Sequence, residues 1–271
     1  MKFIFVSDLH SNKSLFIALE KLISSSKADV LIIGGDIFAY SPNAAPQLEF
    51  AKKYLSEFIK KISVPVYIIP GNCDKPLSVN YLNKMQDYGL INILTLTGTL
   101  INNIEFIGYN YTQPNPFKIK DWERRDLKSD SIVFEGPCFL SDDTDKLNLV
   151  HNDFLNDLTS IEEDLSMLNN KKSIWVMHTP PFGGVLDKNY ANICGGSKAV
   201  RKSIERVQPI LTLHGHIHEA PCMSHKWSER IGNTISLNPG SGELLQAVIF
   251  EIDKDGSIVF INHTLYGELT V

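Results

Sequence analysis

The sequence has little cysteine, no long apolar run and no surplus of positive charge. Its four cysteines, Cys73, Cys138, Cys194 and Cys222, are scattered over 271 residues without a paired-cysteine motif, which predicts reduced thiols in a cytoplasmic protein. No apolar stretch reaches transmembrane length, and the apolar start at residues 3–6 is too short for a secretory signal, so we expect no membrane partner. A net charge of -5 disfavours broad binding to nucleic acid.

What remains is an ordinary globular composition, with 43% hydrophobic and 21% charged residues. A chain of this length fits one large domain or two small ones. It contains no internal repeat and no convincing linker. We therefore expect a single domain over residues 1–271.

Short apolar runs rich in β-branched residues alternate with longer amphipathic stretches. This pattern predicts buried parallel strands joined by helices. The expected strands cover residues 3–6, 30–33, 66–69, 173–177 and 210–213. The expected helices cover residues 14–24, 45–62, 152–168 and 197–207, the last with Ser197 as its N-cap.

Two segments have the pattern of antiparallel hairpins. Residues 95–101 and 104–109 flank Asn102-Asn103, and residues 247–252 and 258–261 flank the turn at 253–256. A mixed sheet, or two facing sheets with helices outside, accommodates both patterns.

Residues 110–148 fit neither pattern. The segment contains Pro114, Pro116, Trp122, Arg124 and Arg125 but few apolar runs. We interpret it as an insertion over one rim of the domain that could act as a lid, with a merely solvated excursion as the alternative. Trp122 and the two arginines could stack on and neutralise a nucleotide, but a charged, amphipathic surface segment is the favoured explanation.

Five polar clusters each follow an apolar run directly. They are Asp8-Leu9-His10, Gly35-Asp36, Gly71-Asn72-Cys73-Asp74, His178-Thr179-Pro180-Pro181 and Gly215-His216-Ile217-His218. Each cluster alone has a structural explanation, such as an N-cap, a turn or a buried imidazole. Because the carboxyl ends of parallel strands share one edge of a sheet, their joint occurrence predicts a shared site.

The donors in these clusters are carboxylate oxygen, amide oxygen and imidazole nitrogen, without thiolate. That mixture suits a pair of divalent transition-metal ions better than calcium or structural zinc. The sequence therefore predicts a two-metal hydrolase.

The ordered set of clusters resembles the calcineurin-like metallophosphoesterase superfamily. The resemblance implies a four-layer α/β/β/α sandwich with two mixed sheets and a dinuclear metal site at the strand carboxyl ends. It places Asp8, His10, Asp36 and His218 around one ion. It places Asn72, His178 and His216 around the other, with Asp36 bridging the two.

The implied activity is that of a metal-dependent phosphoesterase. A phosphodiesterase using a hydroxide between two metal ions is favoured, and manganese, iron, zinc or nickel would suit the donors. The substrate would be a phosphoester, with a nucleotide among the candidates. The alternatives are a phosphomonoesterase (a protein phosphatase or nucleotidase), a non-catalytic interaction scaffold and, disfavoured by the lack of a basic stripe, a nuclease.

Asn72, Cys73 and Asp74 are the predicted catalytic segment. Many members of the superfamily have histidine at the position of Cys73, whereas a branch of small prokaryotic phosphodiesterases also has Gly-Asn-Cys-Asp. Cysteine is normally neutral, so we hypothesise that Cys73 favours esters with good leaving groups. Simple packing behind Asn72 is the alternative. For His214 we expect a supporting role beside the ligands.

Overall fold

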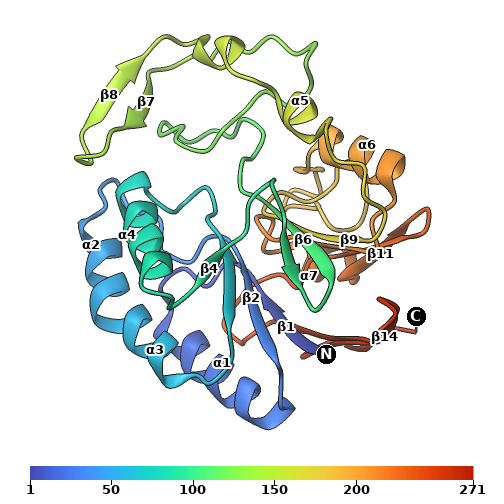
Figure 1. Ribbon diagram of the computed structural model, residues 1–271. Coiled ribbons are helices and arrows are strands. Elements are labelled where there is room, and N and C mark those ends of the chain that lie inside the picture. Colours follow the sequence, from blue (N-terminus) through green and yellow to red (C-terminus); the bar gives the residue numbers. More distant parts are fainter. Residues whose placement is uncertain (271) are drawn as a thin grey trace.

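Two mixed sheets pack face to face, and helices cover their outer faces (Figure 1). The computed structural model describes residues 1–270. The arrangement is the expected four-layer α/β/β/α sandwich, so this prediction of the fold is confirmed.

The first sheet combines the first four strands along the sequence with three strands from residues 248–268. Strands β1, β2, β3 and β4 are parallel, whereas β13, β14 and β15 extend the sheet in antiparallel pairing. In spatial order the strands are β15 (Gly267–Glu268), β14 (Ile258–His263), β13 (Val248–Ile252), β1 (Lys2–Val6), β2 (Val30–Gly34), β3 (Val66–Ile69) and β4 (Asn92–Ile93).

The second sheet has a parallel centre with an antiparallel strand at each edge. Its spatial order is β11 (Ser228–Ile231), β12 (Thr234–Leu237), β10 (Leu211–Leu213), β9 (Ser173–Met177), β6 (Ile104–Tyr109) and β5 (Thr99–Ile101). All five strands expected to be parallel are present in the two sheets.

The helices divide between the two outer faces. The first sheet is covered by α1 (Lys13–Ser26), α2 (Ala45–Phe50), the π-helical turn η1 (Ala51–Leu55), α3 (Ser56–Lys61) and α4 (Pro76–Asp87). The second is covered by α5 (Ile161–Leu165) and α6 (Lys198–Val207), while α7 (Ala220–Ser224) follows β10. The helix predicted over 45–62 is thus one continuous helical stretch with a π turn inside it.

The helix predicted over 152–168 is wrong as a single element. The chain instead forms a 3-10 helix, η2 (Phe154–Asp157), and then the short α5. The physical reason is Ser160, whose side chain accepts a hydrogen bond from the Glu163 backbone N–H while the Glu163 carboxylate accepts one from the Ser160 N–H. Such a capping box starts a new helix and interrupts the old one.

Strand β1 shows why these runs are apolar throughout. Ile4 and Val6 pack into the core under the helices, whereas Phe3 and Phe5 pack into the core between the sheets. Successive side chains of a strand point to opposite faces, so a strand buried on both faces needs apolar residues at every position.

Both predicted hairpins are confirmed. Asn102 and Asn103 adopt φ of 51° and 65° between β5 and β6, a left-handed backbone that asparagine tolerates. β13 and β14 pair across the turn at 253–256. Strand β5 starts at Thr99 rather than at residue 95, because residues 95–98 form a turn closed by the Gly98 N–H and the Thr95 carbonyl.

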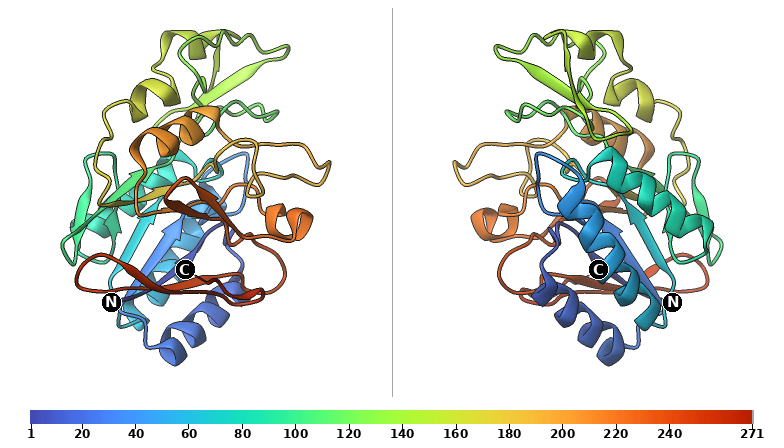
Figure 2. Two further views of the ribbon diagram at one scale, coloured as in Figure 1. Left: turned by 90° about the vertical axis from the view of Figure 1, so that its right-hand side faces the viewer. Right: turned by 90° about the vertical axis from the view of Figure 1, so that its left-hand side faces the viewer.

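The segment predicted as an insertion, residues 110–148, lies in the long connection between β6 and α5. It contains a hairpin that the sequence did not reveal, β7 (Cys138–Ser141) paired with β8 (Leu147–Val150), and it continues through η2. Figures 1 and 2 show it curving above the ends of the central strands. We call residues 110–157 the arch.

Candidate metal centre

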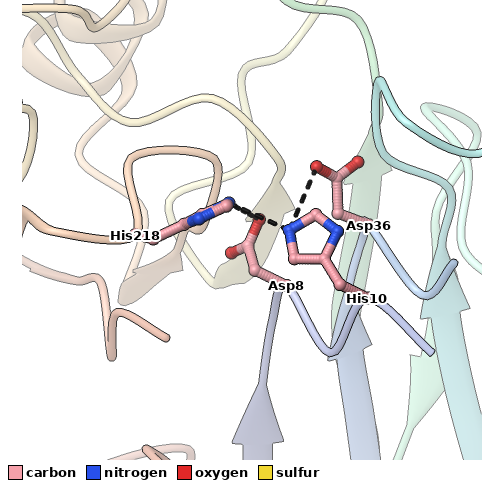
Figure 3. A group of neighbouring side chains, drawn as sticks. All are labelled: Asp8, His10, Asp36 and His218. Atoms are coloured by element: carbon pink, nitrogen blue, oxygen red, sulfur yellow. Dashed lines mark hydrogen bonds and ion pairs between the residues drawn. The ribbon is translucent and has the colours of Figure 1, made fainter. Parts of the chain in front are cut away.

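The structure gathers a first group of ligand atoms from three loops. Single ligand atoms of Asp8, His10, Asp36 and His218 all lie within 4.8 Å of one another. His10 Nε2 is 3.1 Å from His218 Nε2, which is 3.2 Å from Asp8 Oδ1. Figure 3 shows the four side chains directed toward one another.

A second group lies beside the first. Asn72 Oδ1 is 3.1 Å from His178 Nε2 and 2.7 Å from His216 Nδ1. These three residues follow β3, β9 and β10, so the second group draws on both sheets.

Asp36 lies between the two groups. Its Oδ1 is 3.4 Å from His178 Nε2, and its Oδ2 is 3.8 Å from His10 Nε2. One carboxylate therefore presents a separate oxygen to each group. All seven residues predicted as metal ligands are brought together at one edge of the sandwich.

Four of these residues have a left-handed backbone, with φ of 57° for Asp8, 45° for His10, 48° for Asp36 and 67° for His216. Such φ values are uncommon for residues other than glycine, and backbone strain of this kind gathers at functional sites. The turns after β1, β2 and β10 thus adopt costly conformations that direct these side chains inward.

Glycines allow the loops to approach one another. A Cβ at Gly71 would collide with the backbone nitrogen and carboxylate of Asp36, and a Cβ at Gly215 would collide with Ser7 and Asp8. Only glycine fits at these two positions, because the neighbouring atoms belong to the cluster itself or to its supporting strand.

Backbone carbonyls orient two of the imidazoles. His178 Nδ1 is 2.8 Å from the Gly34 carbonyl oxygen, and His10 Nδ1 is 3.3 Å from that of Phe38. A donated Nδ1–H leaves Nε2 with its lone pair toward the cluster. This is the arrangement that fixes the tautomer of a metal-binding histidine.

The carboxylates and imidazoles of the cluster shift one another's pKa values. Burial alone raises the pKa of Asp8 and of Asp36, but the charges of His218 and His178 respectively outweigh it and hold each carboxyl pKa below its ordinary value. Burial lowers the pKa of His178 and His218, yet the two carboxylates raise both to about 9. Buried carboxylates thus demand positive charge nearby.

The donor set fits divalent cations. Two buried carboxylates, an amide oxygen and four imidazoles are nitrogen and oxygen donors of the kind preferred by manganese, iron, zinc or nickel. Burial, followed by the nearby charge of His178, lowers the pKa of His216 to about 4, so this imidazole is neutral and free to ligate at pH 7.

Cys73 and Asp74 face different surroundings. The Cys73 backbone N–H donates to Asp36 Oδ1 at 2.8 Å, and burial raises the pKa of its thiol, with Asp36 adding to the shift. The Asp74 carboxylate is fully buried and accepts hydrogen bonds from the N–H groups of Gly71, Ile37 and Phe38. It therefore joins the loops after β2 and β3 and does not present an oxygen to the cluster.

Residues after β12 support the cluster from behind. Asn238 Nδ2 donates to the carbonyls of Leu186 and Ile217, and Ser241 Oγ donates to the Asp8 carbonyl at 2.7 Å. Sequence reasoning assigned these residues no role. His214 is buried with its Nδ1 3.0 Å from the Thr179 carbonyl oxygen, which suits the supporting role expected for it.

The nucleotide interpretation of Trp122 and Arg125 finds no support. Trp122 Nε1 donates to the Asp74 carbonyl at 2.5 Å, and the Arg125 guanidinium donates to four backbone carbonyls, including those of Leu155 and Leu158. Trp122 thus attaches the arch to the loop after β3, whereas Arg125 connects segments within the arch and at its end. Ser197 caps α6 as predicted, and the Asp126 carboxylate accepts hydrogen bonds from the N–H groups of Lys198 and Ala199.

A groove of about 560 Å³ opens beside the cluster. The cluster's contribution to it is Asp36, Asn72, His216 and His218. The arch contributes residues 113–117 to the lining, and the rest of the lining includes Asn189, residues 194–196 and Glu219. None of the described residues that line it is a lysine or an arginine.

No helix within residues 1–270 is both long enough and apolar enough to cross a membrane. A curated relative, "UPF0046 protein K07C11.7" of Caenorhabditis elegans, is 28% identical over 85 residues. That match covers 31% of this chain and 29% of the relative.

Solved structures resemble the whole chain. One crystal structure has a TM-score of 0.63 at 18% identity and covers 98% of this chain and 99% of its own. TT1561 of Thermus thermophilus has a TM-score of 0.58 at 14% identity, covering 98% of each chain. A protein described as a novel archaeal phosphodiesterase has a TM-score of 0.47 at 12% identity, covering 99% of this chain and 100% of its own. The first two likenesses show the fold alone, and the third carries no statement about substrate.

The family comparison covers far more of the chain than the curated relative does. Residues 1–220 match the family described as Calcineurin-like phosphoesterase, and this segment contains all seven candidate ligands. Members of the family are metal-dependent phosphoester hydrolases, which agrees with the donor set at the sheet edge. The chain belongs to the calcineurin-like phosphoesterase family.

Proposed function

We propose that this protein is a phosphodiesterase that acts with two divalent cations held by the seven clustered residues. The observation that carries the two-cation assignment is Asp36, which offers Oδ1 to the group around Asn72 and Oδ2 to the group around His10. When bound, the cations supply the charge that stabilises a phosphate oxyanion and acidifies water.

The charge of the groove favours a diester over a monoester. A phosphodiester has one negative charge, whereas a phosphomonoester has close to two at neutral pH. The groove offers no lysine or arginine to the second charge, and Glu219 adds a carboxylate to its wall. A monoanionic substrate therefore meets less repulsion there than a dianionic one.

The residues of the predicted catalytic segment take distinct roles in this proposal. Asn72 directs Oδ1 to the imidazoles, while its Nδ2, 3.8 Å from Cys73 Sγ, is the amide donor available to a phosphate oxygen. Cys73 lines the groove as a neutral thiol. Asp74 is a positioning residue, because its carboxylate holds the loops that carry Asp36 and Asn72.

The arch acts as a fixed wall in this proposal rather than as a hinged lid. Lys75 Nζ is 3.0 Å from Ser141 Oγ and 3.7 Å from Asp121 Oδ2. Gln113 accepts a hydrogen bond from Thr179 Oγ1 at 2.7 Å. The arch is thus attached to the body of the protein at more than one point.

The proposed location is the cytoplasm. All four cysteines are free, which supports a reducing compartment.

The test compares matched substrates on protein loaded separately with manganese, iron, zinc or nickel. We expect kcat/KM for bis(p-nitrophenyl) phosphate to exceed that for p-nitrophenyl phosphate by at least about tenfold, because only the second carries an extra charge. Equal values, or a preference for the monoester, would point to a phosphomonoesterase. Inactivity of every metal form on both esters would instead favour a non-catalytic scaffold.

A further inference from the structure

Two exposed aromatic side chains meet beside the metal cluster. Tyr40, in the loop after β2, is 54% exposed, and Phe117, in the arch, is 48% exposed. Their rings stack with centroids 5.5 Å apart and planes inclined by 27°. The two residues come from segments that the fold, not the sequence, brings together.

The pair lies at the substrate groove. Phe117 lines the groove together with Asp36, Asn72 and His218, and it is the one phenylalanine, tyrosine or tryptophan among the described residues of that lining. Tyr40 and Phe117 also line a smaller adjoining cavity that reaches Asn72 and Cys73. Tyr40 therefore packs on Phe117 outside the groove, while Phe117 borders the groove itself.

The backbone around Phe117 is held firmly. The Phe117 N–H donates to Asn115 Oδ1 at 2.9 Å, and the Asn115 carbonyl accepts from Lys120 Nζ at 2.5 Å. Lys120 is itself buried and paired with Glu123 at 3.1 Å. Prolines at 114 and 116 restrict the chain further. The ring is thus positioned before a ligand arrives, which lowers the entropic cost of binding.

The rest of the lining limits what the ring can contact. Pro114, Pro116 and Ile217 are apolar, and apart from the cluster histidines the lining has no lysine or arginine for an additional phosphate. The part of the substrate beyond its reacting phosphate is therefore uncharged or cationic. Among such groups, a flat aromatic one gains most from a positioned ring, since aromatic pairs prefer offset or edge-to-face stacking.

We propose that Phe117, braced by Tyr40, stacks on a flat aromatic group of a monoanionic phosphodiester substrate. The proposal rests on the proposed phosphodiesterase function and names its substrate class. A nucleoside and a simple aryl ester share this chemistry, and the two are separated by the arms of the experiment below.

The experiment measures dissociation constants by calorimetry on the metal-loaded full chain. The probes are phosphinates, which are monoanionic and tetrahedral but lack an ester bond to hydrolyse. They carry a methyl group and, as the second substituent, benzyl, cyclohexylmethyl or a thymidine 5′-methylene group. Wild type is compared with Phe117→Ala, Phe117→Tyr and Tyr40→Ala, and with Tyr88→Ala, which removes an aromatic ring that is 82% exposed and does not line the groove.

We expect Phe117→Ala to weaken binding of the benzyl or the thymidine probe by about 5- to 150-fold, the range for loss of one stacked aromatic contact. Phe117→Tyr should retain binding, Tyr40→Ala should show a smaller loss, and Tyr88→Ala should show none. The cyclohexylmethyl probe should change by less than about threefold, because it lacks a planar ring. Loss with thymidine alone identifies a nucleoside, and loss with benzyl alone identifies an aryl group.

Equal weakening of the cyclohexylmethyl and aromatic probes, or no weakening of either aromatic probe, would overturn the stacking proposal. These outcomes are independent of the diester and monoester rates measured on wild type. The stacking proposal can therefore fail while the phosphodiesterase function is retained. Failure of the phosphodiesterase function would instead be seen in the wild-type rates, whatever the binding measurements show.

Discussion

The metal cluster and the arch border the same groove but are held by different interactions. The cluster residues follow strands whose register is set by continuous backbone pairing in two buried sheets. The arch has only a two-stranded sheet of its own and is attached through side chains such as Lys75, Trp122 and Gln113. In the proposed function, the chemistry therefore lies on the part built on the two sheets, and substrate selection lies on a part attached mainly through side chains.

The largest expected effect concerns the rigid part. Asp36→Asn removes the negative charge that lies between the two ligand groups, so bound metal and transition-state stabilisation are both lost. We expect kcat/KM to fall by at least about 10³-fold, equivalent to about 4 kcal/mol, and metal content measured by elemental analysis to fall with it. Asp143→Asn, an exposed change at the tip of the arch hairpin, serves as the matched control. An Asp36→Asn protein with full metal content and activity would remove the basis for a shared bridging carboxylate.

The next effect concerns the interior of the arch. Burial raises the pKa of Glu123 to about 7, although Lys120 acts in the opposite direction. In the unfolded chain this carboxyl ionises near pH 4.5, so the folded state retains a proton that the unfolded state has lost between these values. The contribution of Glu123 to stability should therefore fall by about 3 kcal/mol as the pH rises from about 4.5 to about 7, and stay level above pH 7.

Urea unfolding at about pH 5 and about pH 8, on either side of this transition, tests the dependence. Glu123→Gln should reduce the difference in unfolding free energy between the two pH values by about 3 kcal/mol, whereas Glu135→Gln, an exposed change in the same arch, should leave it as in wild type. The same pH difference in all three proteins would show that Glu123 ionises normally.

A smaller effect is expected where the two regions meet, at Cys73. Cys73→His introduces an imidazole that can protonate a leaving group, and general acid catalysis of this kind is worth about 10²-fold or more when well placed. We expect a gain of roughly 10- to 100-fold for alkyl phosphodiesters, with little change for nitrophenyl esters, which need no protonation. Cys73→Ala provides the baseline. An equal response of both ester types would leave Cys73 with a packing role only.

The smallest effect concerns the attachment of the arch. Lys75→Met removes the charge that contacts Asp121 and Ser141, so the arch should open more often while the metal cluster stays intact. We expect KM to rise roughly fivefold, equivalent to about 1 kcal/mol, with kcat retained and faster hydrogen exchange in residues 110–157. Lys171→Met, an exposed change, is the control. Unchanged KM and exchange would show that the arch does not depend on this contact.

The two regions also differ in how far the sequence predicts them. Asp36 and His178 could be placed together because each follows an apolar run, and parallel strands end at a common edge. The four-layer fold followed from the same runs together with the family resemblance. By contrast, the hairpin of β7 and β8 has exposed leucines and polar turns, so its residues show no buried periodicity.

Other features depend on contacts that no local pattern encodes. Tyr40 and Phe117 lie in separate loops, and nothing in the sequence near either residue indicates that their rings stack. Asp74, expected to take part in the chemistry, is instead directed at three backbone N–H groups. A motif in the sequence thus predicts the region in which a side chain lies. It does not predict as well which atoms that side chain contacts.

The central position of β1 has a consequence for how the protein is made. Lys2–Val6 pairs with β2 on one side and with β13, residues 248–252, on the other, and the amino group of Met1 donates to the Ile252 carbonyl. During synthesis the turn that carries Asp8 and His10 therefore emerges about 240 residues before β13, and its strand lacks one of its two neighbours until residue 252 has left the ribosome. Such distant pairing slows folding and leaves a strand edge uncovered, so the nascent chain is expected to need protection from aggregation until β13 has been made.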